Sequence, residues 1–424
     1  MSNWKKGALH THSYWSDGRG FPEQVIMAYK RRHYDFLSIT DHNRFASQTD
    51  EWREVFSEEG PWPPKTSQTI FNDYLETFGK DWLHIKKDEG KTLVRLKTYS
   101  ELKNKFEETG KFLLLPGIEI TQCLNSNNSH LHVNYINIPE IIPCVKDSSL
   151  VHHIKDSRRT MAELLKINYM EARQSANKFK TSYLVFLDHP FWSYYDVDPR
   201  VLIDNPEACF FEICNNGSDF APSPKVPDYT LDKFWDIVNA FRALNSQKLL
   251  YGIASDDAHF YDSKRIDGVG GVGDAWIMVR SKELNPDSLF TAMKEGDFYA
   301  TCGVLLEELS FNLENRTLYL KVKVAKGISY RIHFITTKKN FERNFEEITI
   351  PTENGHPQRT IPLYSKDIGK TVKTVAGTEA TYKLADDDLY VRAKIESTKP
   401  CHIKPYFNPE KQTAWTQPYT IPSI

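Results

Sequence analysis

The sequence predicts an α/β protein with a mainly parallel sheet, open or closed into a barrel, followed by a small antiparallel β-sandwich. Three observations carry this prediction. The first 300 or so residues contain seven short apolar runs that are nearly continuously hydrophobic, as expected for strands buried on both faces. Several of the spacers between these runs have helical periodicity. After about Gly303 the apolar residues alternate with polar ones instead.

The seven runs are the expected strands of the first part of the chain. They are rich in β-branched and aromatic residues, and each of them ends at or directly before a polar or charged residue. Their alternation with helical segments favours a parallel sheet. The runs span residues 4–10, 35–40, 112–121, 130–136, 183–188, 209–214 and 249–254.

Helices are expected over residues 21–32, 160–174 and 231–244. In the first, a proline stands where the first turn would begin and basic residues collect in the last turn. The spacer of residues 43–111 is too long for a simple connection, and it contains turn-forming and helix-like stretches. We therefore expect an insertion over one end of the domain, as a lid or a substrate wall.

The last part of the chain has the pattern of an antiparallel domain. Apolar and polar residues alternate over residues 318–324, 330–335, 381–384 and 389–396, with turn-forming stretches between them. The predicted division is an α/β domain of residues 1–302 and a β-sandwich domain of residues 303–424.

The composition narrows the class of protein. The chain has 424 residues with 40% hydrophobic content and a formal net charge of -2, which gives no reason to expect a nucleic-acid partner. Its six cysteines form no C-x-x-C pair, so neither a disulfide scaffold nor a zinc finger is indicated. No apolar run is long enough for a membrane helix. We expect a soluble protein without membrane partners, cytoplasmic as the sequence stands, or periplasmic or secreted if a signal peptide has been removed. Its oligomeric state is not predicted.

Histidines and carboxylates gather at the ends of the expected strands. Ligands of parallel α/β folds collect at the carboxyl ends of the strands. Seven of the fourteen histidines lie on or beside these strands, which favours a common metal-binding function. Imidazole and carboxylate donors without thiolate suit Zn, Mn or Fe. The residues are His10, His12 and Asp17, Asp41 and His42, Glu119, His130 and His132, Asp188 and His189, Glu212 and Asn215, and Asp256, Asp257 and His259.

These motifs resemble, in order, those of the polymerase and histidinol phosphatase (PHP) family of metal-dependent phosphoesterases. The resemblance covers about residues 5–300 and implies a distorted seven-stranded (β/α) barrel. The overall layout, with the trailing β domain and the stretch 414–419, resembles the bacterial branch that includes carbaryl hydrolases. The motifs are L9-H-T-H-S-Y-W-S-D-G18, I39-T-D-H-N43, G117-I-E119, L131-H-V133, D188-H-P190 and S255-D-D-A-H259.

The resemblance implies two or three divalent ions with shared ligands. His132 is preferred over His130, and Asp257 over Asp256, because they match the family motifs better. Asp41 and Asp188 are candidates to orient ligand imidazoles. One ion would be held by His10, His12, Glu119 and Asp257, a second by Glu119, His132 and His189, and a third by Asp17, His42 and His259.

The predicted function is that of a metal-dependent hydrolase, in which hydroxide bound to several ions attacks phosphorus or a carbonyl carbon. The catalytic candidates are Asp17, His42, Asp257 and His259. A small-molecule phosphoester is the leading substrate class. Carbamate or carboxyl-ester hydrolysis on the same centre is the alternative, and a non-catalytic metal-binding module is a second alternative.

Four basic residues are candidates for binding a phosphate, because they lie in loops after the metal motifs. The aromatic residues beside the motifs suit a substrate wall, although packing is the favoured interpretation for them. The stretch 268–273 matches G-x-G-x-x-G, but an expected strand follows it, which argues against a dinucleotide site. The basic candidates are Arg19, Arg44, Lys264 and Arg265, and the aromatic ones are Tyr14, Trp15, Phe191 and Trp192.

Overall fold

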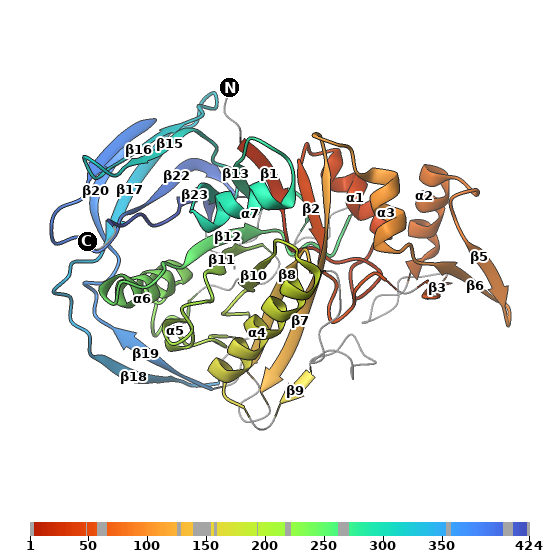
Figure 1. Cartoon of the computed structure of the whole chain (residues 1–424), viewed down its shortest axis with the longest axis horizontal. Coiled ribbons are helices and arrows are strands. Elements are labelled where there is room, and N and C mark those ends of the chain that lie inside the picture. Colours follow the sequence, from red (N-terminus) through yellow and green to blue (C-terminus); the bar gives the residue numbers. More distant parts are fainter. Residues whose placement is uncertain are drawn as a thin grey trace.

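The structure is a computed structural model that describes residues 4–47, 49–56, 66–124, 129–138, 154–156, 159–192, 194–216, 222–261, 271–352, 358–401 and 410–421. It is a mixed α/β protein built around a large sheet that extends from its central part into its C-terminal part (Figure 1). The strand order along this 14-stranded sheet is β12-β11-β10-β8-β7-β2-β1-β13-β14-β23-β22-β17-β20, with β9 paired to β7.

All seven strands predicted for the first part of the chain are present, and they form one continuous half of the large sheet. Their residues are buried almost throughout, which agrees with the near-continuous apolar runs. The strands are β1 (Trp4–Ala8), β2 (Phe36–Ile39), β7 (Leu113–Leu124), β8 (His130–Ile136), β10 (Leu184–Leu187), β11 (Phe210–Asn215) and β12 (Tyr251–Ser255). The short strand β9 (Ile154–Asp156) adds to β7.

The expectation of a parallel sheet is wrong at β8. This strand is antiparallel to both of its neighbours, with Thr121 of β7 opposite His132 and Leu187 of β10 opposite Val133. The chain between β7 and β8 is only residues 125–129, and a parallel pair needs a crossover of a dozen residues or more. The reversal places the beginning of β8, with His132, at the rim where the parallel strands end.

The sheet is not closed into a barrel among the described residues. Beyond β1 it continues with the antiparallel strands β13 (Trp276–Arg280) and β14 (Phe298–Thr301). The free edge of β12 is instead met by a side chain from the C-terminal part. The amide of Gly252 donates to Oε1 of Gln417 at 2.8 Å, and Nε2 of Gln417 donates back to the Gly252 carbonyl at 2.9 Å. The side-chain amide thus makes the two hydrogen bonds that a neighbouring strand would make.

The three predicted helices are present, and the second extends beyond the predicted end to Phe179. A capping box between Thr160 and Glu163 begins that helix. Among the described residues no helix is both long and apolar enough to cross a bilayer. The helices of this part are α1 (Pro22–Lys30), α4 (Met161–Phe179), α5 (Pro199–Ile203), α6 (Leu231–Leu244) and α7 (Pro286–Lys294).

The insertion of residues 43–111 lies at one end of the molecule (Figure 1). The helix-like stretches within it form α2 (Gln68–Phe78) and α3 (Tyr99–Phe106). Its small sheet, of order β4-β3-β6-β5, was not predicted. Arg53 joins this sheet to the loop after β1, since its guanidinium donates to the carbonyls of Tyr14 at 2.6 Å and Trp15 at 3.2 Å. The strands are β3 (Trp52–Phe56), β4 (Thr66–Ser67), β5 (Ile85–Asp88) and β6 (Lys91–Arg95).

The C-terminal part is antiparallel, as predicted, and it adds strands to the large sheet. A separate three-stranded sheet and a two-stranded sheet accompany it. Leu318 and Leu320 of the three-stranded sheet share a core with Ile332 and Phe334 of the large sheet. The division at residues 302 and 303 stays a prediction. The strands are β15 (Leu306–Asn312), β16 (Thr317–Val322), β17 (Tyr330–Thr336), β18 (Phe345–Ile350), β19 (Arg359–Tyr364), β20 (Lys370–Ala376), β21 (Glu379–Lys383), β22 (Arg392–Pro400) and β23 (Lys411–Thr416).

A buried ion-pair network joins α6 to β22. The fully buried guanidinium of Arg392 contacts Asp236 at 2.6 Å and Asp232 at 2.9 Å, and Lys394 contacts Asp232 at 2.9 Å. Burial on its own would raise the pKa of Asp232, but Lys394 and Arg392 outweigh it and lower that pKa to about 2.

Candidate metal centre

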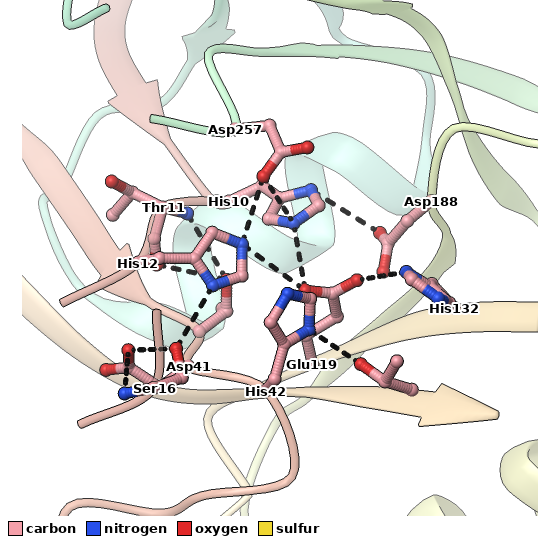
Figure 2. Close-up of polar contacts among 12 residues, drawn as sticks. His10, Thr11, His12, Ser16, Asp41, His42, Glu119, His132, Asp188 and Asp257 are labelled. Atoms are coloured by element: carbon pink, nitrogen blue, oxygen red, sulfur yellow. Dashed lines mark hydrogen bonds and ion pairs between the residues drawn. The ribbon is translucent and has the colours of Figure 1, made fainter. Parts of the chain in front are cut away.

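The nine residues predicted as metal ligands lie together in one buried cluster at the rim of the large sheet. Figure 2 shows six of them, His10, His12, His42, Glu119, His132 and Asp257. The cluster draws residues from the ends of β1, β2, β10 and β12, the middle of β7 and the start of β8. Seven of its members are at most 5% exposed. The imidazoles of His42 and His259 are 14% and 18% exposed, so the cluster meets solvent on their side.

One group of donors surrounds Asp257. Its Oδ1 lies 3.0 Å from Nε2 of His12 and 3.3 Å from Nε2 of His10. Both imidazole nitrogens are also 3.3 Å from Oε2 of Glu119. This convergence of two imidazoles and two carboxylates is the arrangement expected around a single divalent ion.

A second group surrounds the other oxygen of Glu119. Oε1 lies 2.7 Å from Nδ1 of His132 and 3.6 Å from Nε2 of His189. The two oxygens of Glu119 therefore face different sets of imidazoles, as a carboxylate that bridges two ions would.

A third group surrounds Asp17. Its carboxylate lies 3.2 Å from Nε2 of His42, 3.4 Å from Nε2 of His259 and 3.5 Å from Nδ1 of His12. His12 thus has its two ring nitrogens directed at two different groups. His42 also lies beside Glu119, with its Nδ1 at 2.8 Å from Oε2.

The charges of these residues fit divalent cations. In the part of the chain that the structure describes, the ion-pair partners of Asp17 and Glu119 are all histidines. Burial opposes ionisation, yet the surrounding imidazoles, His42 first, hold the pKa of both carboxyls well below the usual range. Burial, followed by His259 and His42, lowers the pKa of His12 to about 4, so its imidazole is neutral and able to ligate. The ionised carboxylates and the neutral imidazole of His12 are donors that a divalent ion would complete. The nearby carboxylates outweigh burial and raise the pKa of His10, His42 and His259, so a bound cation would take the place of protons on these rings.

Glu212 orients His10, a member of the donor group around Asp257, although the sequence indicated no specific role for Glu212. Its Oε1 accepts a hydrogen bond from Nδ1 of His10 at 2.8 Å, so the other ring nitrogen faces Glu119 and Asp257. Oε2 accepts from the backbone amide of His189 at 2.8 Å, and Ser255 also donates to the carboxylate. The end of β11 at the same rim was the only sequence signal for this residue.

Asp41 and Asp188, the candidates to orient ligand imidazoles, have different partners: Asp41 binds the loop after β1, and Asp188 lies near His10. Asp41 holds the loop after β1, because its oxygens accept from the amides of Ser13 at 2.7 Å and Ser16 at 3.0 Å and from both hydroxyls at 2.6 Å. Burial raises the pKa of Asp41 to about 6, against the hydrogen bonds from the two serines. Asp188 accepts from Nδ2 of Asn134 at 2.9 Å and lies 3.8 Å from Nδ1 of His10.

In each of the two pairs of alternative ligands, Asp256 or Asp257 and His130 or His132, one residue faces the cluster and the other does not. Asp257 has a left-handed φ of 47°, which directs its carboxylate into the cluster, whereas Asp256 points away and accepts from the amides of Gly273, Asp274 and Ala275 at 2.7–3.0 Å. His132 lies against Glu119. The ring of His130 packs instead on Trp192, with 4.8 Å between centroids.

Of the residues predicted to contact a substrate, Trp192 lies beside the cluster. The half-buried ring of Trp192 lies 5.1 Å from that of His132 and 5.8 Å from that of His189, and it suits a wall of the site. Arg19 lies over Phe260, with 4.7 Å to the ring centroid, and Arg44 lies 3.9 Å from Glu51. A phosphate-binding role for either arginine stays a prediction.

The other candidates have the following positions. Lys264 and Arg265 lie outside the described residues, as does the first half of the stretch 268–273. The aromatic residues Tyr14, Trp15 and Phe191 are buried in hydrophobic clusters, in agreement with the packing interpretation.

Comparisons with known proteins found no matching family model and no match among curated proteins. The solved structures that are similar to the chain include the following two. One is a two-domain protein from Bacteroides vulgatus that contains a predicted PHP-like metal-dependent phosphoesterase. It has 14% identity and a TM-score of 0.40, over 99% of this chain and 95% of that one. The other, from Bifidobacterium adolescentis, is named as a candidate metal-dependent phosphoesterase. It has 11% identity and a TM-score of 0.32, over 62% of this chain and 90% of that one.

Proposed function

We propose that the protein is a metal-dependent hydrolase that acts on small-molecule phosphoesters. The observation that carries this proposal is the pair of carboxylates, Asp17 and Glu119, that are buried among six imidazoles. Such a donor set is costly to bury unless cations complete it. Because every donor is an imidazole or a carboxylate, the ions would be Zn, Mn or Fe.

Two or three ions would share these residues. The first would be held by His10, His12, Asp257 and one oxygen of Glu119. The second would be held by the other oxygen of Glu119 with His132 and His189, and the third by Asp17, His42 and His259. When bound, such ions lower the pKa of water and stabilise negative charge on the oxygens of a substrate.

The chain's own residues would shape the reaction in two ways. His42 and His259 stand on the side that meets solvent, so a substrate would approach the cluster past these two imidazoles. Nδ1 of His259 donates to the carbonyl of Asp257 at 2.8 Å, which keeps Nε2 directed at Asp17. His42 and His259 line the accessible side of the cluster, and the buried Asp17 and Asp257 lie directly beside them; these four are the catalytic candidates.

A phosphoester suits this arrangement better than a carboxyl ester or a carbamate. Several adjacent cations can stabilise both the attacking and the leaving oxygen of an in-line displacement at phosphorus, and an acyl substrate has less need of this. The fold that we infer for this function is a distorted, open relative of the seven-stranded barrel, with a β-sandwich at residues 303–424. A lid role for residues 43–111 belongs to the same proposal.

The test is a substrate screen on protein reconstituted separately with Mn, Zn and Fe. We expect turnover of p-nitrophenyl phosphate or bis-p-nitrophenyl phosphate, and its loss in His12→Ala and Asp257→Ala. His130→Ala is the matched control, because this histidine lies beside the cluster but outside the donor groups. Turnover of p-nitrophenyl acetate alone would favour the esterase alternative. Bound metal without any turnover would favour the non-catalytic one, and retained activity in both variants would contradict the catalytic assignment.

A further inference from the structure

Two cysteines approach each other where the C-terminal strands meet β14. Sγ of Cys302 and Sγ of Cys401 are 3.4 Å apart, although the residues are 99 positions apart in the chain. Cys302 follows directly after β14, and Cys401 follows directly after β22. The contact therefore joins the α/β part of the chain to its C-terminal part.

The backbone holds both cysteines against β23. The amide of Cys302 donates to the carbonyl of Thr413 at 2.9 Å, and the amide of Thr413 contacts Sγ of Cys302 at 3.2 Å. The amide of Cys401 donates to the carbonyl of Glu410 at 3.0 Å. Cys302 is thus hydrogen-bonded to β23 and Cys401 to the residue directly before β23, so the contact between the thiols is a property of the fold.

We propose that Cys302 and Cys401 are an oxidation site that forms an intramolecular disulfide when the protein meets a low-molecular-weight disulfide. A covalent bond requires the sulfur atoms to approach to about 2.05 Å. The sulfur atoms would have to approach each other further from their separation of 3.4 Å. The role is independent of the proposed metal chemistry, because neither residue belongs to the donor groups.

The reaction would proceed in two exchange steps. Cys401 is half-buried and Cys302 is 3% exposed, so Cys401 is the thiol that an external disulfide reaches first. The Cys401 thiolate attacks one sulfur of oxidised glutathione and releases one glutathione thiolate. The Cys302 thiolate then attacks the Cys401 sulfur of the mixed disulfide and releases the second glutathione. The two protein thiols lose two protons and two electrons in all, and one oxidised glutathione becomes two reduced ones.

The surroundings of the pair make this oxidation slow at neutral pH. Burial, followed by the neighbouring thiol of Cys214, raises the pKa of Cys302 well above its usual value, and the contact with Cys302, followed by burial, raises the pKa of Cys401. Since the thiolate is the reacting form, the rate should increase as the pH becomes alkaline. The disulfide would join the end of β14 to the end of β22 and so close a loop of about a hundred residues.

The experiment uses the full-length protein, first reduced and then incubated with oxidised glutathione at mildly alkaline pH. Free thiols are blocked, and the protein is digested with trypsin without reductant and analysed by mass spectrometry. We expect the peptide of residues 295–316 to be linked to that of residues 395–411, and neither to be linked to the peptide of residues 201–225, which carries Cys209 and Cys214. The thermal midpoint of the oxidised protein should be higher by about 5 °C, since a long loop is closed.

Single substitutions separate the outcomes. Cys302→Ser and Cys401→Ser should each abolish the linked peptide and the thermal shift, whereas Cys209→Ser should change neither. A stable glutathione adduct on Cys401, a bond between Cys214 and Cys302, or no crosslink after prolonged incubation would overturn the proposal. The crosslink is first measured in the protein without substitutions. The proposal can therefore be tested even if one of the variants fails to fold.

Discussion

The hydrogen bonds between Gln417 and Gly252 give a stability prediction that depends on one side chain. Gln417 is fully buried, and it satisfies both the amide and the carbonyl of Gly252 on the free edge of β12. In Gln417→Met the side chain keeps nearly the same length and volume but can neither donate nor accept. The substitution therefore removes the two hydrogen bonds without leaving a large cavity.

The magnitude follows from the two backbone groups that lose their partners. A buried donor or acceptor left unsatisfied costs about 1–3 kcal/mol, so two such groups cost about 2–6 kcal/mol. The gain from burying the more apolar methionine offsets part of this cost. We expect the free energy of unfolding to fall by about 3 kcal/mol, which is a large fraction of the stability of an ordinary domain.

Urea unfolding measures this change, and amide hydrogen exchange shows where it acts. The midpoint should fall at an unchanged slope, and the amide of Gly252 should exchange faster than in the original protein. Lys411→Met is the matched control, because this exposed side chain begins β23, the strand that ends directly before Gln417, and it should leave both readouts unchanged. A loss of less than about 1 kcal/mol would refute the reasoning, since two unsatisfied buried groups should cost more than that.

Three other predictions concern the metal centre and the ion-pair network. Glu212→Gln should weaken metal binding about 10–100-fold by metal titration, because His10 loses its carboxylate partner; unchanged affinity would remove Glu212 from the site. Chelation of bound ions should lower the thermal midpoint, since the buried carboxylates would lose their cations, and an unchanged midpoint would argue against metal binding. The depressed pKa of Asp232 contributes about 2 kcal/mol of stability at neutral pH, and about half of this should be lost by about pH 3. The stability difference between the protein and Asp232→Asn should shrink accordingly in urea titrations, whereas Asp228→Asn, at a side chain that is 83% exposed, should show no such trend.

The strands and the cluster were predictable because each depends on a local pattern. Every apolar run became a strand, and the polar residues at the strand ends then had to meet at one rim. The direction of β8 was missed because a run of apolar residues carries no information on direction. The short connection after Leu124 contained that information, since it excludes a crossover.

The features that were missed depend on contacts between distant segments. Nothing local in the sequence shows that Gln417 would reach Gly252, 165 positions away. The role of Glu212 also becomes visible only once His10 lies beside it. The sheet of the insertion consists of short strands, one of them with four exposed residues, and such strands have no hydrophobic alternation to detect.

The donors around Glu119 come from distant parts of the chain, and this affects how the cluster assembles during folding. Nε2 of His12 lies 3.3 Å from Glu119 and 3.0 Å from Asp257, and His12 and Asp257 are 245 positions apart in the chain. No short segment contains a complete donor set, so a growing or partly folded chain would offer a cation only the local donors around His10 and His12. Contacts over such a separation form late and slowly. The centre would therefore be completed only after the strands from β1 to β12 have assembled. Cleavage of the chain between these strands, with loss of one fragment, would remove part of the donor set.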